Sequence, residues 1–526
     1  MSATFLSADL VAPNGIRLKQ PLGLFINNEF VKAKSSQTIT AINPALVSFW
    51  KSFSSSTFSD EQEIAIVQAA GSEDVDIAVQ AARDALNGPW GDLSPTQRGR
   101  MLSLLADIVQ ANATTLATIE SWNSGKPYQI ALDEDVEEVI SVFRYYAGYA
   151  DKLQGQVIET EKNRHIFTTR EPIGVCGQII PWNYPLSMAA WKLAPAIATG
   201  NCIVMKAAEQ TPLSILYLAS LVPEAGYPKG VINIINGYGR DAGAALASHV
   251  DVDKIAFTGS TETGKTIMKL ASANLKSITL ETGKHQGGKS PLLVFEDADL
   301  DKAAYWAHIG VMSNAGQVCT ANSRVFVHEK VYDQFLQRFL DNIRGAKIGD
   351  PFGTETFQGP QINMSQRDRV LRYIDIGKSE GATLAIGGNI WGNSTSRKGF
   401  FLEPTVFTDV TDDMTICREE IFGPVAAVAK FKTEEEALER ANDIPFGLGA
   451  AVFTRDISRV HRVSRKIKSG RVPITNSKVA VWVNSSNDSD IRAPFGGFKQ
   501  SGIGLECGQA GIEAYTAVKT VLVTLD

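Results

Sequence analysis

The chain has 526 residues, of which 44% are hydrophobic and 21% charged, with a formal net charge of −6. This length is too great for one hydrophobic core, so we expect two or three domains. Nucleic acid is not expected as a partner, because phosphate binding needs a clustered basic surface and the sequence has no Lys/Arg run. No apolar run reaches the ~18 residues of a membrane span, and Met1 to Gln20 does not resemble a signal or transit peptide. We therefore expect a cytoplasmic protein without a membrane partner.

The cysteines and histidines show no metal-binding spacing. The five cysteines are scattered and none forms a CxxC pair: Cys176, Cys202, Cys319, Cys417 and Cys507. This usage is typical of a reducing compartment and excludes an obvious zinc site. We expect no metal.

The first 150 residues contain a predicted hairpin followed by helices. Residues 22–31 (LGLFINNEFV) place two apolar runs around Asn27 and Asn28, which tolerate turn conformations. Apolar residues at helical spacing predict helices over residues 74–86, 96–120 and 133–149.

From residue 173 onward, short apolar strands alternate with helices. The first series has strands at 174–180, 202–206, 231–235, 254–259 and 277–281, with helices at 185–199, at 212–225 and after Thr263. A second series begins near Ser290 and runs through SRVFVH and AAVAKF to VWVN. Such alternation predicts parallel sheets, an α/β fold class and two domains with a cleft between them.

Two further segments, 154–170 and 515–525, alternate apolar and polar residues like exposed strands. Strands of this kind usually add to another sheet, here a partner subunit's. We therefore expect a homo-oligomer.

Three residues are candidates for catalysis. Cys319, in SNAGQVCTANSR, is flanked by small and polar residues before a β-run, as a reactive thiolate at a cleft would be, although most single cysteines are inert buried thiols. Glu281 closes the strand SITLE, where α/β sheets bind ligands, but a solvated strand-end carboxylate fits equally well. Asn183, in PWNYP, can aim its amide at an oxyanion or belong to a rigid turn.

Three glycine-rich or charged segments follow predicted strands and are candidates for a dinucleotide site. GYGRDAG (237–243) is a weak signal alone, whereas TGSTETGK (258–265) leads into a helix N-terminus that can receive a pyrophosphate. Lys206 and Glu209 end a third strand. A carboxylate there can accept ribose hydroxyls and would repel a 2′-phosphate, so NAD is favoured over NADP.

These motifs, in this order, resemble the aldehyde dehydrogenase superfamily, in particular its fungal and other eukaryotic members, from about Leu24 onward. The segments that carry the resemblance are IIPWNYP, FTGSTETGK, GQVCTANSR, EEIFGPV and APFGGFKQSGIG. It implies a Rossmann-like NAD-binding domain (22–150 and 173–283), a catalytic α/β domain (284–499) and a β-flap for oligomerisation (151–172 and 505–526). The implied assembly is a homodimer or homotetramer.

The resemblance also implies a role for each matching residue. Cys319 matches the nucleophile, Glu281 the general base, and Asn183 the oxyanion donor that works with the Cys319 backbone N–H. Matches to NAD contacts are Trp182, Lys206, Glu209, Gly239, Ser260, Thr263, Glu420 and Phe422; those to the substrate pocket are Tyr184, Trp191 and Phe495. The implied reaction oxidises a small aldehyde to a carboxylic acid through a cysteine thiohemiacetal and thioester. A glutamate base favours hydrolysis over acyl transfer to coenzyme A.

Three segments depart from the family pattern, at about 46–68, 282–286 and 472–480. The second separates Glu281 from GGKSP, so that the sequence runs ETGKHQGGKSP. Our hypothesis is that some or all are gene-model artefacts, which sequencing the transcript would decide; the alternative is true loop insertions. Displacing Glu281 by about 1 Å can cost ~100-fold in rate, so a catalytically impaired oligomer is an alternative function.

The predicted pocket contains several polar residues. Ser485, Asp488 and Ser489 lie where relatives often carry bulkier apolar side chains, and Val318 precedes the nucleophile. We expect a more polar or roomier pocket. A semialdehyde or betaine-aldehyde specialist would share the chemistry and differ only there.

Overall fold

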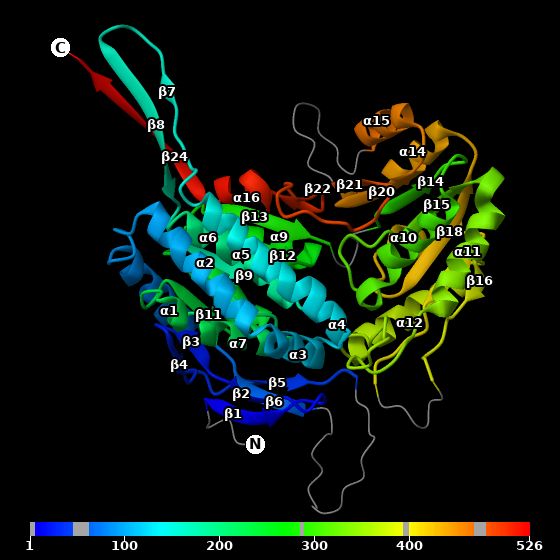
Figure 1. Ribbon diagram of the computed structural model, residues 1–526, viewed down its shortest axis with the longest axis horizontal. Helices are drawn as coiled ribbons and strands as arrows, with labels where there is room; N and C mark the ends of the chain where they lie inside the picture. The colour runs from blue at the N-terminus through cyan, green and yellow to red at the C-terminus, as the bar shows by residue number, and fades with distance from the viewer. Residues whose placement is uncertain (1–5, 46–62, 284–288, 393–398, 468–479, 526) are drawn as a thin grey trace, which may run out of the picture.

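Two largely parallel sheets, one in each half of the chain, form the body of the molecule (Figure 1). The computed structural model describes residues 6–45, 63–283, 289–392, 399–467 and 480–525. The central strands are buried along their whole length, for example β9 (Val175–Ile179) and β15 (Arg324–His328). Burial on both faces explains why these strands are nearly continuous apolar runs. The predicted α/β fold class is confirmed.

The first sheet has eight strands, and its five central ones run parallel. In spatial order they are β23 (Gly502–Ile503), β13 (Ser277–Thr282), β12 (Lys254–Gly259), β9, β10 (Cys202–Lys206), β11 (Ile232–Ile235), β3 (Leu24–Ile26) and β4 (Glu29–Val31). The helices of this half are α1 (Ser72–Leu86), α2 (Pro95–Ala111), α3 (Ala113–Ser124), α4 (Tyr128–Ile130), α5 (Glu137–Tyr149), α6 (Pro185–Ala198), α7 (Leu213–Leu221), α8 (Ala244–Ser248), α9 (Thr261–Ala271) and α16 (Gly508–Glu513), with the shorter or wider turns η1 (Ala131–Val136), η2 (Pro223–Ala225) and η3 (Gly239–Gly243).

The second sheet has seven strands and is parallel except for its edge strand β16. In spatial order they are β16 (Thr383–Ile386), β17 (Thr405–Thr408), β18 (Val425–Phe431), β15, β14 (Pro291–Val294), β20 (Gly449–Phe453) and β21 (Ala480–Val483). Its helices are α10 (Leu300–Met312), α11 (Tyr332–Gly345), α12 (Met364–Ser379), α13 (Thr415–Arg418), α14 (Glu434–Asn442) and α15 (Ile457–Lys466), with η4 (Ser313–Gly316) and η5 (Glu329–Val331).

Small antiparallel pairs complete the described strands: β1 (Ser7–Val11) with β2 (Arg17–Pro21), β5 (Thr38–Ile42) with β6 (Glu63–Gln68), and β19 (Phe446–Gly447) with β22 (Phe498–Lys499). The predicted hairpin at 22–31 is confirmed as β3 and β4. Asn27 and Asn28 have φ angles of 56° and 62°. Left-handed conformations at both turn residues match the right-handed twist of the strands they connect.

The single helix predicted over 96–120 is wrong, because α2 and α3 meet at an angle of 71°. Asn112 ends α2: its side-chain Nδ2 donates to the carbonyl of Ile108 at 2.9 Å, satisfying one of the open carbonyls of the last turn. Of the described helices, none alone is long and apolar enough to span a membrane; taken together, this bent pair meets that criterion of length and composition.

A long antiparallel arm projects from the body (Figure 1). It consists of β24 (Thr516–Thr524), β8 (Arg164–Pro172) and β7 (Val157–Ile158), with β24 paired to β8 along its whole length. The strand predicted to add to a partner's sheet thus has β8 of its own chain as a neighbour. Its second edge carries no described strand.

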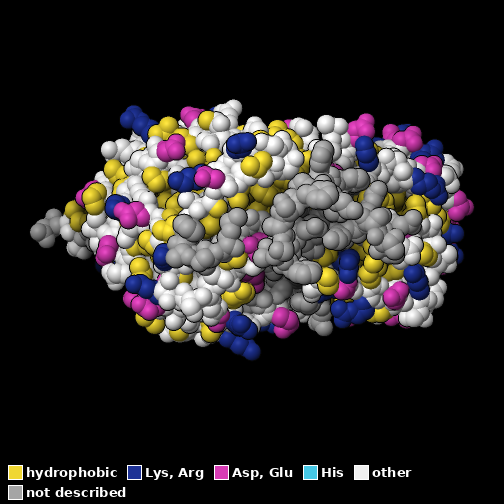
Figure 2. All heavy atoms as spheres, turned by 90° about the horizontal axis from the view of Figure 1, so that it is seen from below, with side chains coloured by type: hydrophobic (Ala, Val, Ile, Leu, Met, Phe, Trp, Pro, Cys, Tyr) yellow, Lys and Arg dark blue, Asp and Glu magenta, His cyan; other side chains and the backbone are white. Residues whose placement is uncertain are grey.

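The three departing segments are described only at their ends. β6 pairs with β5, Thr282 is the last residue of β13, and β21 begins at Ala480. Residues 46–62, 284–288 and 468–479 lie outside the described residues, so the gene-model hypothesis stays a prediction, as do the domain boundaries. Figure 2 shows Lys and Arg side chains interspersed with Asp and Glu over one face of the molecule.

Candidate active site

The nucleophile candidate Cys319 lies on a tightly constrained turn. Asn314 and Ala315, just before it, have left-handed φ angles of 49° and 55°. At Gly316, with φ +73°, a Cβ would lie 2.0 Å from the backbone of Gly423, so only glycine fits. Strained backbone of this kind persists only where the surroundings over-determine it, and it is common at active sites. The turn therefore fixes the position of Cys319.

Glu281 lies in contact with this cysteine, at the carboxyl end of β13. Its carboxylate is hydrogen-bonded to the Cys319 thiol. Backbone pairing holds Glu281 between Thr258 of β12 and Gly502 of β23. Glu281 is thus paired on both sides within the sheet, and whether the segment at 282–286 displaces it stays a prediction.

Both groups are perturbed by their surroundings. Burial, reinforced by the negative charge of Glu506, raises the pKa of Glu281 to about 7. Burial and then the neighbouring Glu281 carboxylate raise the pKa of the Cys319 thiol well above its ordinary value. Of the two groups, the Glu281 carboxylate is therefore the proton acceptor and the Cys319 thiol the donor.

A buried ion pair lies next to Glu281 and is linked to it through Thr258. Lys192 Nζ lies 2.8 and 3.0 Å from the two carboxylate oxygens of Glu506, and it donates to Thr258 Oγ1 at 2.8 Å. Thr258 Oγ1 in turn lies 3.5 Å from Glu281 Oε2. The sequence interpretation missed Lys192 and Glu506; the available signal was a lysine inside an otherwise apolar helix (AAWKLAPA), which must find a partner when buried.

Asn183 is buried beside the nucleophile turn. Its Nδ2 donates to the carbonyl of Gln317 at 3.1 Å, and Asn314 Nδ2 donates to the Asn183 carbonyl at 3.0 Å. These contacts tie the PWNYP turn to the segment that carries Cys319. The amide that the sequence singled out is thus bonded to the backbone two residues before Cys319.

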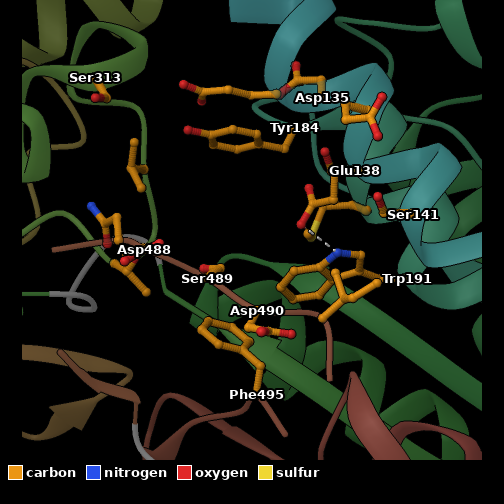
Figure 3. A pocket seen from close by; sticks show the side chains of 18 of the residues that line it. Asp135, Glu138, Ser141, Tyr184, Trp191, Ser313, Asp488, Ser489, Asp490 and Phe495 are labelled. Atoms are coloured by element: carbon orange, nitrogen blue, oxygen red, sulfur yellow. Dashed lines mark hydrogen bonds between the residues drawn. The ribbon is translucent and has the colours of Figure 1, made fainter. Parts of the chain in front are cut away.

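A cavity of about 960 Å³ is lined in part by Cys319 and Glu281; Figure 3 shows other residues around it. Cys319 and Glu281 line it together with all three aromatic residues predicted for the substrate pocket, Tyr184, Trp191 and Phe495. The Trp191 and Phe495 rings meet edge to face with centroids 5.3 Å apart. Val318, Asp488 and Ser489 also line the cavity, whereas Ser485 is not among its lining residues.

The predicted cofactor residues gather at the carboxyl ends of neighbouring parallel strands. Lys206, the last residue of β10, is buried and forms a 2.9 Å ion pair with the half-exposed Glu209. Ser260 caps α9 by accepting from the Thr263 N–H at 3.1 Å. At Gly239, the first residue of η3, a Cβ would meet nothing within 4 Å, so the space above its backbone is open.

The remaining cofactor candidates form a small aromatic corner. The Trp182 and Phe422 rings meet edge to face at 5.4 Å. Gln366 and Arg369 of α12 hold this segment, donating to the carbonyls of Phe422 at 2.7 Å and Glu420 at 2.9 Å. Phe422 has a left-handed φ of 60°, which these bonds stabilise.

This donor set fits NAD. An accessible carboxylate suits ribose hydroxyls, and the open backbone at Gly239 with the capped start of α9 suits a pyrophosphate. Both lie at strand ends, where open α/β sheets bind their ligands.

Comparison with known proteins agrees with this geometry. A model of the aldehyde dehydrogenase family matches residues 50–521. The chain is 50% identical over 507 residues to an aldehyde dehydrogenase of Emericella nidulans, covering 96% of each protein. It is 49% identical over 505 residues to retinal dehydrogenase 2 of Homo sapiens, covering 95% of this chain and 92% of that protein. The NAD+ complex of an aldehyde dehydrogenase from Bacillus cereus superposes with a TM-score of 0.89 at 46% identity, over 96% of this chain and 97% of that one.

Proposed function

This chain belongs to the aldehyde dehydrogenase family and oxidises an aldehyde with NAD+; from that premise we propose which residues do so and what they release. The product is a carboxylic acid, formed through a thioester on Cys319. The observation that carries the proposal is the contact between the Cys319 thiol and the Glu281 carboxylate, both of which line the cavity.

In the first half of the reaction, Glu281 accepts the thiol proton as the sulfur adds to the aldehyde carbon. The raised pKa of both groups means that the thiolate forms only as the substrate is attacked, and not in the resting enzyme. The side-chain amide of Asn183 and the Cys319 backbone N–H donate to the new oxyanion, a contribution of about 3 kcal/mol from one such donor.

In the second half, the thiohemiacetal loses hydride and the thioester is hydrolysed. NAD+, held by the strand-end residues, supplies the hydride acceptor. Glu281 first releases the thiol proton to solvent. It then takes a proton from a water molecule that attacks the thioester, and Cys319 leaves as a thiolate that recovers this proton from Glu281. A carboxyl whose pKa is about 7 suits both proton transfers, because it accepts and returns a proton at neutral pH.

Rapid-mixing measurements of NADH formation test these roles. Cys319→Ala should abolish oxidation of every aldehyde, on the order of a 10⁴-fold loss or more. Glu281→Gln should slow turnover by about 10²–10⁴-fold while releasing at most one NADH per site, because the thioester is no longer hydrolysed. Glu439→Gln, the same change on an exposed residue of α14, serves as the control. Full turnover by Cys319→Ala would refute the proposal.

We also propose that the arm makes the protein a homodimer or homotetramer. The available edge of β24 is apolar in part, with Leu522 66% and Val518 58% exposed, and such an edge pairs readily with another strand. Sedimentation should find an assembly of two or four chains, and Leu522→Asp should shift it toward monomer. A monomeric wild type would overturn this proposal.

A further inference from the structure

The substrate cavity is lined by far more acidic than basic side chains. Apart from Glu281, seven of its lining residues are Asp or Glu and two are Arg. The cavity is a substrate site whatever its charge, because Cys319 and Glu281 are among its lining residues. The acidic lining therefore bears on which aldehyde enters, and this inference rests on the proposed function.

The cations around the cavity are already paired. Arg492 holds Asp490 through bonds of 2.8 and 3.1 Å, and Arg144 turns to Asp107 at 3.0 Å. Lys126 forms a buried ion pair with Asp135. Among the residues that the structure describes, no salt bridge reaches the two other carboxylates considered below.

Those carboxylates are Glu134 and Glu138, one turn apart on η1 and α5. Residues four apart lie on the same helix face, so both line the cavity from one side. Glu138 accepts a hydrogen bond from Trp191 Nε1 at 3.1 Å. Burial raises the pKa of both carboxyl groups, and the ammonium of Lys126, which is itself paired with Asp135, only partly offsets this.

Aromatic rings surround the same space. Figure 3 shows Tyr184, Trp191 and Phe495 arranged around the cavity, with Glu138 between the first two. Ring faces together with a carboxylate form the chemical environment that binds organic cations, ammonium and quaternary ammonium groups included. A neutral or anionic substrate would leave Glu138 desolvated without a counter-charge.

We propose that Glu138, aided by Glu134, selects aldehydes whose far end carries an alkylammonium group. The aldehyde carbon reaches Cys319 while the cation lies between Glu138 and the rings of Trp191 and Phe495, since Lys126 Nζ already lies 3.7 Å from the centroid of the Tyr184 ring. An aldehyde ending in a carboxylate is repelled by the same residues.

The test compares substrates matched in size. Wild-type enzyme is assayed with a trimethylammonium-tailed butanal, its neutral isostere in which carbon replaces nitrogen, aminopropanal with butanal as its neutral match, and succinic semialdehyde. We expect kcat/KM for each cationic aldehyde to exceed that of its neutral match by about tenfold or more. A stronger preference for the quaternary group assigns most recognition to the rings; one for the primary ammonium assigns it to the carboxylates.

Glu138→Gln keeps the acceptor for Trp191 and removes only the charge. It should reduce the cationic preference, the ratio of kcat/KM for a cationic aldehyde to that for its neutral match, by about tenfold, chiefly through KM for the cationic aldehyde. Glu134→Gln should have the same effect to a smaller degree, and Glu439→Gln on α14 none. If wild type oxidises neutral aldehydes as well as cationic ones, or if the preference survives both substitutions, this inference is wrong and the proposed function stands. If no aldehyde is oxidised, the proposed function itself fails.

Discussion

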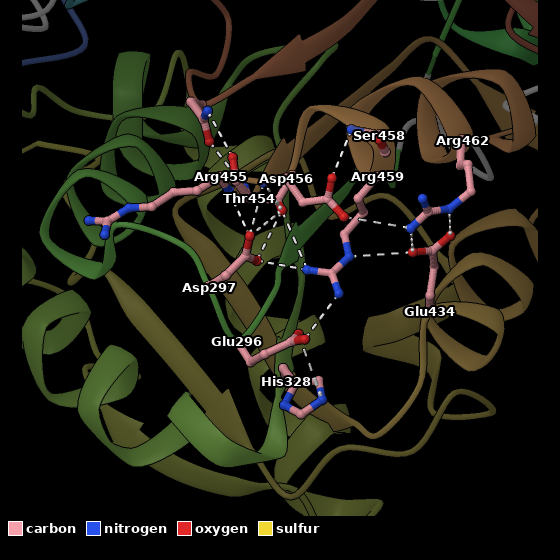
Figure 4. Close-up of polar contacts among 11 residues, drawn as sticks. Glu296, Asp297, His328, Glu434, Thr454, Arg455, Asp456, Ser458, Arg459 and Arg462 are labelled. Carbon is pink, nitrogen blue, oxygen red and sulfur yellow. Dashed lines mark hydrogen bonds and ion pairs between the residues drawn. The ribbon is translucent and has the colours of Figure 1, made fainter.

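Two polar networks, one beside each sheet, use the same residue types to opposite effect. Beside the second sheet, Arg459 of α15 binds Glu296 at 3.0 Å, Asp297 at 2.7 Å and Glu434 at 3.3 Å (Figure 4). Beside the first sheet, Lys192 binds only one carboxylate, that of Glu506, and Glu281 lies close by. The Arg459 network is partly exposed to solvent, whereas the Lys192 network is buried.

The difference appears in the carboxyl groups. The Arg459 network keeps its solvent and has a second guanidinium, Arg462, and it holds the pKa of Glu434 below the ordinary value. In the buried network Lys192 binds Glu506 and lies near Glu281, and burial raises the pKa of Glu281 to about 7. Desolvation thus produces a proton acceptor in the buried network, whereas carboxylates that keep solvent and bind guanidinium groups form a structural network.

The largest effect should come from breaking the buried pair. Lys192→Met leaves the Glu506 carboxylate buried without its partner, which costs about 3–5 kcal/mol in the free energy of unfolding. Thermal or chemical denaturation measures it. The double variant Lys192→Met, Glu506→Leu should recover much of the loss, because no buried charge remains. A single variant as stable as wild type would show that the pair is not desolvated.

The second effect is the pH dependence of turnover. Glu281 must be ionised to accept a proton, and its raised pKa of about 7 means that it is protonated below that pH. With hydrolysis limiting, kcat should therefore fall roughly tenfold per pH unit below about pH 7 and level off above it. Stopped-flow and steady-state rates across this range check it, with Glu281→Gln as the flat control. A wild-type kcat that does not vary below pH 7 would remove Glu281 from the hydrolytic step.

The smallest effect is expected at the exposed network. Arg459→Lys keeps the charge but loses the planar fork that reaches three carboxylates, so unfolding should cost about 1 kcal/mol less than in wild type. The difference should shrink in high salt, since half-exposed charges are screened. Denaturation at low and high ionic strength measures the loss of unfolding free energy and its dependence on salt. A loss of unfolding free energy as large as that of Lys192→Met would contradict the comparison.

The motif residues could be predicted from sequence because each belongs to a short segment at one end of a strand. Cys319, Glu281 and Asn183 were all singled out in this way; Cys319 and Glu281 line one cavity, and Asn183 is bonded to the nucleophile turn at Gln317. The Lys192–Glu506 pair joins residues 314 positions apart. Neither residue lies in a motif with the other, so only the packed fold brings them together.

The two cavity carboxylates, Glu134 and Glu138, were missed in the sequence for a different reason. The helix predicted over 133–149 includes Glu134 and Glu138, and their four-residue spacing was visible as a shared face. On an exposed helix that pattern is an ordinary solvated stripe. What distinguishes the Glu134 and Glu138 pair from such a stripe is that aromatic residues of α6 and Phe495 line the same cavity.

The late position of the edge strand β23 in the chain has a consequence for folding during translation. It pairs with β13 through Glu281 and Gly502, which are roughly 220 residues apart in the chain. A ribosome adding about 5–20 residues per second needs about 10–40 s to pass from one to the other. Throughout that interval a nascent chain presents the hydrogen-bonding edge of β13 unpaired, beside its future catalytic base. Such an edge invites pairing with other nascent chains, so chaperone occupancy during translation should peak before Gly502 emerges.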